Sequence, residues 1–521
     1  MTKPAETASA LWETLKAMPR PTLNELFAGD PKRVEALTRR LDWPNGASEE
    51  DGEMSGMRVD FSKTHLDDAA LETFEQLADA MGFAEAREAL FSGGIVNVTE
   101  GRAANHGAMR GSGTDADTEE AGALLARMGM LVDAIHEGVL GDIKHLIHIG
   151  IGGSALGPAL AVDALTRDLA KVDVHVVSNI DGLALEQAFA ACDPATTLIA
   201  VASKTFTTIE TMTNAASALA WLEREGVSDP SGRVVALTAN PEKAVEWGVD
   251  ETRILPFPES VGGRYSLWSS IGFPVAMAIG MEEFREFLGG AQAIDTHFRE
   301  AEGRANAPLL AAFSDLYYAR VRGCQTRAVF AYDERLALLP DYLQQLEMES
   351  NGKSVTASGE PVDAPTAPIT WGGVGTDAQH AVFQLLHQGT HLIPVDFIAS
   401  VAPGDELDPA HHKTLLTNCF AQGAALMAGG NMSADGKDPA RAFAGNRPST
   451  MFLVDDLDPS TLGALIAFHE HRTFANAVLM GINPFDQFGV ELGKSIAKQI
   501  DAGGGDFDAS TLALMEAAGL R

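Results

Sequence analysis

The sequence predicts an α/β protein with two doubly wound parallel sheets, preceded by a helical arm and followed by a short tail. Two observations support this fold class. Short apolar, β-branched segments alternate with helical stretches in two successive sets, which is the pattern of parallel sheets covered by helices on both faces. The chain has 521 residues, more than a single hydrophobic core usually accommodates, so we expect at least two domains.

The first part of the chain, residues 1–117, is predicted to be a mainly helical arm. The segments LNELF, VEALTRRL and LETFEQLADAMGF carry apolar residues at three- and four-residue spacing, which is typical of amphipathic helices. Loops are expected at 42–56 and 111–117, where glycine and polar residues gather.

The two sets of strands define the predicted domains. In the first domain, 118–280, the strand segments are KHLIHIG, VHVVSN, TTLIAVAS, RVVALT and TRILPF, and the uncharged run 265–281 predicts a buried helix. In the second, 281–500, a helical connection precedes RAVFAY, APITW, HLIPVDF and STMFLVD. The tail, 501–521, carries one short amphipathic segment. Ligands of such sheets bind beyond the carboxyl ends of the strands, so the loops there are expected to carry the chemistry.

Composition restricts the classes of partner. The formal net charge is −34, from 38 Lys and Arg against 72 Asp and Glu, and a field of that sign disfavours nucleic acid and anionic membranes. Neither a signal peptide nor a membrane-spanning run is evident, so we expect a cytoplasmic protein. The three cysteines, Cys192, Cys324 and Cys419, are far apart in the sequence, and no histidine lies at zinc-site spacing from them. We therefore predict buried thiols and no metal site.

A glycine-rich loop follows the first predicted strand, in HLIHIGIGGSALGPAL. Glycines let backbone N–H groups approach an anion at a helix N-terminus. Three interpretations compete: a phosphomonoester site that includes Gly153 and Ser154, a tight structural turn, and a dinucleotide site. Gly150, Gly152 and Ala155 fit G-x-G-x-x-A, but a dinucleotide site requires an acidic residue at the end of the next strand, where the sequence has Ser-Asn. The phosphomonoester interpretation is therefore favoured.

Hydroxyl groups crowd the turn after the third predicted strand, in VASKTFTTIET. Hydroxyls, free N–H groups and one ammonium group suit the oxygens and charge of a phosphate. A threonine-rich helix cap with a solvated lysine is the structural alternative. Two such loops on neighbouring strand ends favour one shared phosphate pocket, which would use Ser203, Lys204, Thr205 and Thr208.

Four later segments each carry polar candidates that, taken singly, have ordinary structural explanations. In chain order they are Arg264 after two glycines, Gln345 and Glu349 four apart on one helix face, His380 at a loop-to-helix start, and Gln487, Glu491 and Lys494 along one face of a later helix. A carboxylate such as that of Glu349 can act as a general base, and an arginine such as Arg264 offers a fixed cation for a developing negative charge.

Together these segments resemble the glucose-6-phosphate isomerase family. Two long signatures, ESVGGRYS at 259–266 and FDQFGVELGK at 485–494, occur with the blocks NVTEGRAANHGAMR, GIGGSALGP, SKTFTTIET, MESNGKS and QHAVFQLLHQGT. The resemblance extends from about residue 97 to 500. Small departures occur at Ala155, at Leu346-Glu347 and at Asp377-Ala378, and none of them removes a reacting group.

The resemblance implies two sugar-isomerase (SIS) domains, a homodimer, and a reaction without metal or cofactor. It implies that glucose 6-phosphate and fructose 6-phosphate are interconverted through ring opening and an enediol, in glycolysis and gluconeogenesis. By resemblance, the phosphate would contact Gly153, Ser154, Ser203, Lys204, Thr205 and Thr208, the sugar Gln345 and Gln487, and the catalytic groups would be Arg264, Glu349, His380 and Lys494. A non-catalytic sugar-phosphate sensor and an isomerase that also accepts mannose 6-phosphate remain alternatives.

Overall fold

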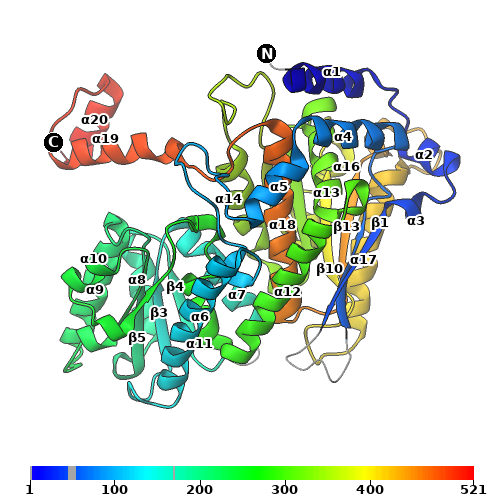
Figure 1. The fold of residues 1–521 in the computed structure, drawn as a ribbon. Coiled ribbons are helices and arrows are strands. Elements are labelled where there is room, and N and C mark those ends of the chain that lie inside the picture. The colour runs from blue at the N-terminus through cyan, green and yellow to red at the C-terminus, as the bar shows by residue number, and fades with distance from the viewer. Residues whose placement is uncertain (1–2, 45–53, 168–169, 521) are drawn as a thin grey trace. The chain divides into compact units, whose positions relative to one another are not determined.

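The computed structural model describes residues 3–44, 54–167 and 170–520. The chain divides into two compact units, Met1–Pro484 and Phe485–Arg521, and Figure 1 labels their elements. The first unit is a mixed α/β structure with two main sheets, so the predicted fold class is confirmed. In the parts of the chain that the structure describes, none of the helices combines the length and apolar character needed to cross a bilayer.

The helices and strands follow the sequence in four groups. The arm contains α1 (Lys3–Ala17), α2 (Leu23–Gly29), α3 (Arg33–Leu37), β1 (Thr38–Pro44), β2 (Met54–Asp60), α4 (Asp68–Ala80) and α5 (Phe83–Phe91). Helix α6 (Asp115–His136) begins at the end of the arm and belongs mostly to the predicted first domain. The first sheet region contains β3 (His145–Ile149), α7 (Leu156–Leu165), β4 (Asp173–Val177), α8 (Gly182–Ala191), β5 (Thr197–Ala202), α9 (Ile209–Arg224), β6 (Val234–Thr238), α10 (Pro241–Trp247), β7 (Ile254–Pro256) and α11 (Phe273–Ile279).

The second sheet region contains α12 (Met281–Glu300), α13 (Ala307–Leu316), β8 (Thr326–Tyr332), α14 (Leu339–Asn351), β9 (Ile369–Val374), α15 (Gly375–Ala381), α16 (Phe383–Gln388), β10 (Val395–Ser400), α17 (Ala410–Ala428), β11 (Gly430–Asn431), β12 (Ala442–Phe443), β13 (Ser449–Val454) and α18 (Pro459–Met480). The unit Phe485–Arg521 contains α19 (Glu491–Asp501) and α20 (Ala509–Ala517). Each strand expected from the apolar runs is present.

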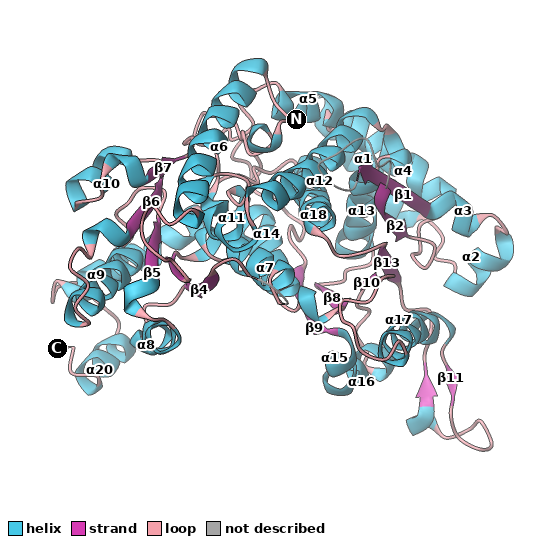
Figure 2. Cartoon of the chain, turned by 90° about the horizontal axis from the view of Figure 1, so that it is seen from below, coloured by secondary structure: helices cyan, strands magenta, loops and turns pink. Residues whose placement is uncertain are grey.

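The first sheet has the strand order β4-β3-β5-β6-β7, and all its pairs are parallel. Its strands lie between helices, as Figure 2 shows. One face packs against α8, α9 and α10 in a core that includes Ile147, Ile199, Ala215 and Trp221. The strand that follows β3 in the chain, β4, lies on one side of β3, and the next strand, β5, lies on its other side. The direction in which strands are added therefore reverses between β3 and β5. In doubly wound sheets, ligands bind beyond the carboxyl ends of the strands at this switch point.

The second sheet has the order β1-β2-β13-β10-β8-β9. The strands β13, β10, β8 and β9 are parallel, and β2 adds to β13 in the antiparallel sense. Helices α15, α16 and α17 pack on one face through residues that include Phe383 and Leu426. The prediction of a parallel sheet is thus correct for the four strands that the sequence indicates.

The β1–β2 hairpin corrects the prediction that the segment VEALTRRL of the arm is helical throughout. In VEALTRRL, helix α3 ends at Leu37, and TRRL belongs to β1. Buried Leu41 and Trp43 alternate with exposed Arg40 and Asp42, which is the two-residue period of a strand. Pairing with the edge of β13 satisfies the backbone of the hairpin, and this tertiary contact outweighs the helical spacing. Residues 45–53 of the expected 42–56 loop lie outside the described residues.

Helix α18 is buried along nearly its whole length and carries charges into the core. Arg472 donates to Asp315 of α13 and to Asp396 of β10, with Nε and Nη1 at 2.6 Å from the two carboxylates. Arg327 of β8 joins the same cluster, 2.7 Å from Asp315. Buried charges are tolerated when they are paired and hydrogen-bonded, as here. This cluster therefore links α18 to the second sheet.

Candidate active site

The glycine loop after β3 lies directly against the segment that carries Arg264. Gly152–Ser154 forms one 3-10 turn and Gly263–Tyr265 another. A Cβ atom at Gly153 would lie 2.2 Å from the carbonyl carbon of Gly263 and 2.4 Å from the backbone nitrogen of Arg264. Because these are backbone atoms that cannot rotate away, only glycine fits here. The close approach brings the predicted phosphate loop beside Arg264.

Arg264 and Glu349 form an ion pair at the C-terminal end of α14. Arg264 Nη1 lies 3.3 Å from Glu349 Oε1, and the two side chains are 2% and 24% exposed. Gln345, one turn earlier on α14, donates from Nε2 to Glu349 Oε2 at 2.7 Å. The predicted four-residue spacing thus places both side chains on one face of the helix. Both oxygens of Glu349 have a partner, while the carboxylate stays open to solvent.

The Arg264 guanidinium is fixed by further contacts. Its Nε donates to Ser350 Oγ at 2.7 Å, and Nη2 donates to the carbonyl oxygen of Pro484. Tyr265 Oη lies 3.0 Å from the same Ser350 oxygen. A buried cation held in this way interacts more strongly with a nearby negative charge than one in water does. The group is therefore preorganised to stabilise an anion beside Glu349.

The hydroxyl-rich turn after β5 faces the same region. Ser203 Oγ lies 3.0 Å from Thr208 Oγ1, and Thr207 Oγ1 donates to Thr205 Oγ1 at 2.8 Å. Lys204 Nζ donates to the carbonyl oxygens at positions 259 and 261, at 2.6 and 3.1 Å. These carbonyls belong to the segment that leads into Arg264, so Lys204 ties the hydroxyl turn to that segment. Burial, together with the nearby charge of Arg102, lowers the pKa of Lys204 to about 8.

A dinucleotide site would need an acidic residue at the end of β4, and none is there. β4 ends at Val177 and is followed by Ser178 and Asn179. Asp181, further on, uses its side chain to accept from the backbone nitrogen of Leu183, as the N-cap of α8. Its carboxylate is therefore engaged in capping a helix, which favours the phosphomonoester interpretation of the glycine loop.

The remaining predicted residues belong to other elements. His380 is exposed in the last turn of α15, not at a helix start as the sequence predicts. Among the described residues, the side chain of Glu349 contacts Gln345 and Arg264 but not His380. Gln487 and Lys494 belong to the unit Phe485–Arg521. Gln487 precedes α19, whereas Glu491 and Lys494 lie within it, so the prediction of one continuous helix face is wrong for Gln487.

Two supporting residues escaped the sequence analysis. Ser350 is fully buried and joins Arg264 to Tyr265. Lys353 Nζ donates to the carbonyl oxygens of Glu349 and Ser350, at 2.7 and 2.8 Å, and so satisfies the last turn of α14. A lysine just after a predicted helix end was the available signal for this role. No local signal marks Ser350, because its partners are distant in sequence.

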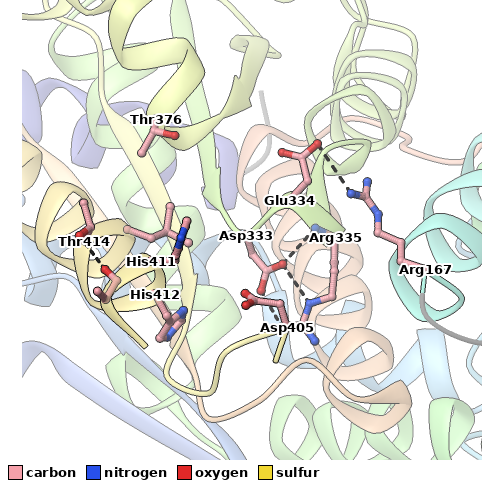
Figure 3. Close-up of a pocket in the computed structure, with 12 residues that line it drawn as sticks. Arg167, Asp333, Glu334, Arg335, Thr376, Asp405, His411, His412 and Thr414 are labelled. Atoms are coloured by element: carbon pink, nitrogen blue, oxygen red, sulfur yellow. Dashed lines mark hydrogen bonds and ion pairs between the residues drawn. The ribbon is translucent and has the colours of Figure 1, made fainter. Parts of the chain in front are cut away.

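A separate cavity of about 750 Å³ lies at the carboxyl ends of β8 and β10 in the second sheet (Figure 3). Its cations already have carboxylate partners. Arg335 makes two hydrogen bonds to Asp333, at 2.8 and 3.0 Å, and Arg167 points toward Glu334, 3.7 Å away. None of the predicted site residues lines it. The candidate active site is therefore the region around Arg264 and Glu349.

Comparisons with known proteins give a consistent result. A family model described as phosphoglucose isomerase matches residues 60–515. A glucose-6-phosphate isomerase of Erythrobacter litoralis is 74% identical, over 98% of both chains, and one of Novosphingobium aromaticivorans is 68% identical, over 98% of this chain and 99% of its own. The crystal structure of a glucose-6-phosphate isomerase from Chlamydia trachomatis superposes with a TM-score of 0.86 at 30% identity, covering 99% of each chain.

Proposed function

Because this chain belongs to the phosphoglucose isomerase family, it interconverts glucose 6-phosphate and fructose 6-phosphate, and we propose that Glu349 and Arg264 perform the proton transfer. The observation that supports this proposal is the Arg264–Glu349–Gln345 arrangement beside the glycine loop. A sugar-phosphate sensor needs a phosphate pocket, but it has no use for a solvent-accessible carboxylate paired with a buried arginine.

The phosphate is held at the switch point of the first sheet. Gly153 and Ser154 supply backbone and hydroxyl donors from one loop, and Ser203, Lys204, Thr205 and Thr208 supply hydroxyls and a cation from the next. Local donors of this kind are needed because the chain as a whole carries a charge of −34. Holding the phosphate there leaves the sugar chain free to extend toward Glu349.

Glu349 removes the proton from one sugar carbon and returns it to the adjacent one. A carboxylate on one face of the enediol reaches both carbons, so a single base suffices. Arg264 stabilises the negative charge that develops on the enediolate oxygen, and its fixed position means that little reorganisation is needed. Gln345 orients the carboxylate through its hydrogen bond.

His380, Lys494 and Gln487 complete the proposal by family resemblance. His380 protonates the ring oxygen during ring opening, Lys494 assists at the hydroxyl groups, and Gln487 contacts the sugar. The exposure of His380 supports a role in the pocket of a second subunit of a homodimer. We also propose, by family resemblance, that the enzyme works in the cytoplasm.

The role of Glu349 is tested by Glu349→Gln in deuterium oxide. The variant keeps the hydrogen-bonding shape but loses the base, so we expect kcat to fall by about 10²-fold or more, with a parallel loss of solvent deuterium in the product. The inhibition constant of an unreactive sugar phosphate should hardly change. Asp341→Asn, an exposed carboxylate in the first turn of the same helix, serves as the matched control. Normal kcat at saturation with weakened binding would make Glu349 a binding residue.

The same assay separates the remaining substrate alternatives. Fructose 6-phosphate is incubated with the wild-type enzyme, and glucose 6-phosphate and mannose 6-phosphate are quantified separately. Formation of glucose 6-phosphate alone identifies a strict isomerase. Mannose 6-phosphate at a comparable rate would identify a pocket that accepts both configurations at the second carbon.

A further inference from the structure

Three potential metal ligands meet at the amino end of the first sheet. His145 is the first residue of β3, His175 lies in β4, and Cys192 follows α8. One ligand atom from each lies within 4.8 Å of the others. The sequence separations, 30 and 17 residues, match no zinc-binding motif, which is why the sequence analysis predicts no metal site.

The sheet register brings the two imidazoles together. β3 and β4 are parallel, with His145 opposite Asp173 and Ile147 opposite His175. His145 and Ile147 therefore share one face, and so do His175 and Val177, since alternate residues of a strand point the same way. Ile147, Val177 and Cys192 belong to one core cluster. The two imidazole rings lie at the border of this core, with centroids 6.3 Å apart.

One imidazole nitrogen in this group of residues lacks a partner. Nδ1 of His145 is buried and has no hydrogen-bond partner among the described residues. The nearest carboxylate oxygen, Oδ2 of Asp173, is 3.9 Å away, which is too far for a hydrogen bond. A buried polar atom without a partner is unfavourable, and a bound ion or a water molecule there would satisfy it.

We propose that His145, His175 and Cys192 form a zinc site, with Asp173 or water as the fourth ligand. Imidazole nitrogen and thiolate sulfur are the ligands that Zn²⁺ prefers. Zinc–ligand bonds of about 2.0 to 2.3 Å place tetrahedral ligand atoms about 3.3 to 3.8 Å apart. Closing the site from the observed separation requires side-chain movements of about 1 Å, which rotamer adjustment provides.

The protonation of the free ligands agrees with this chemistry. Burial lowers the pKa of His175, so its imidazole is neutral and has a lone pair. Burial raises the pKa of the Cys192 thiol to about 11, so the free thiol is protonated and poorly reactive. Binding of Zn²⁺ would release that proton and leave a thiolate–metal bond.

The position of the site indicates a structural role. His145 begins β3 and Gly150 follows its end, so the two positions are separated by about 16 Å at 3.3 Å per residue. The metal therefore lies at the opposite end of the sheet from the phosphate loops. It ties β3, β4 and the segment after α8 together without contacting the sugar, so the site is independent of the proposed catalytic mechanism.

The test measures metal binding by the whole protein, stripped with a chelator and then titrated with Co²⁺ and Zn²⁺. We expect about one Co²⁺ per chain, with a near-ultraviolet thiolate-to-cobalt band and displacement by Zn²⁺. Cys192→Ser should abolish the band, and His175→Ala should weaken binding at least tenfold. Zn²⁺ should raise the melting temperature of the wild type only, and isomerase activity should survive chelation.

Matched controls separate this site from adventitious binding. Cys419→Ser removes another buried thiol, and His411→Ala with His412→Ala removes an adjacent histidine pair; both variants should bind as the wild type does. Circular dichroism verifies the fold of each variant, and His145→Gln replaces any variant that fails to fold. Absence of binding at micromolar metal overturns the proposal, and so does binding that persists unchanged in Cys192→Ser and His175→Ala.

Discussion

At the scale of single residues, the charge of Lys204 is unusually sensitive to alkaline pH. Its ammonium group is partly buried against two backbone carbonyls, and burial together with Arg102 lowers its pKa to about 8, from an ordinary value of 10.5. Because the folded-state pKa is lowered, the proton is lost as pH rises through about 8. A phosphate group bound there would lose its main side-chain cation over the same range.

Inhibition by inorganic phosphate should therefore weaken above pH 8. Phosphate is already a dianion there, so only the protein changes its charge. One unit above its pKa, Lys204 is about one-tenth protonated, and we expect the inhibition constant to rise up to about tenfold by pH 9. Lys204→Met should bind phosphate weakly and without this pH dependence. Lys243→Met, which removes an exposed lysine of α10, should keep it. An unaltered pH profile in Lys204→Met would place the phosphate elsewhere.

At the scale of elements, the contact between two 3-10 turns holds Arg264 beside the glycine loop. Gly153→Ala forces a Cβ atom to within 2.2 Å of the backbone of Gly263, so the turn that carries Arg264 must move. A displacement of about 1 Å at an active site costs about 10²-fold in rate, and we expect a loss of that order in kcat/KM. Gly182→Ala is the matched control, because nothing lies within 4 Å of a Cβ atom at that position in the first turn of α8. Wild-type activity in Gly153→Ala would show that the turns are not coupled.

Helix α18 depends on its buried charge cluster. Burial alone would raise the pKa of Asp315, but Arg327 and Arg472 lower it below its ordinary value, so the carboxylate stays ionised. Arg472→Met leaves Asp315 and Asp396 with too few cationic partners. Removing one member of a buried ion pair costs about 3 to 5 kcal/mol, and we expect a loss of that size in denaturant unfolding at fixed protein concentration. Arg441→Met, at an exposed ion pair, should change stability by less than about 0.5 kcal/mol. Equal stability of both variants would show that the buried charge cluster makes no net contribution to the free energy of unfolding.

At the scale of the whole molecule, the proposed homodimer makes a prediction about shared sites. If His380 enters the pocket of the partner, each site takes Glu349 from one subunit and His380 from the other. The variants Glu349→Gln and His380→Ala then remove groups that different subunits supply. Mixed and refolded in equal amounts, the two variants form about half heterodimers by random pairing. Each heterodimer then has one doubly mutated site and one intact site, so activity should recover to about a quarter of the wild-type level.

Each variant refolded alone is the control for this experiment, and heterodimers are verified by differently tagged chains. Recovery to about a quarter supports a site built from two subunits. If verified heterodimers stay inactive, all catalytic groups come from one chain, and His380 acts within its own subunit. The isomerase activity itself does not depend on which outcome is found.

Local pattern alone determined the parallel strands of the two sheets and the loops that follow them. β3 and β5 are short apolar runs, and the glycine loop and the hydroxyl turn follow them directly, so sequence neighbours already define the proposed phosphate pocket. The helix spacing of Gln345 and Glu349 is likewise a local property. Such features are predictable because each depends on residues within one or two turns or strands.

Only the tertiary structure decided which distant segments meet. Arg264 reaches Glu349 and Ser350 across about 85 residues of chain, and Gly153 contacts Gly263 across a similar distance. The β1 segment has a helix-like spacing but becomes a strand because β13 offers β2 an unpaired edge. His145, His175 and Cys192 converge only through the register of two strands. Contacts of this kind depend on the packing of whole elements, and local spacing carries no information about that packing.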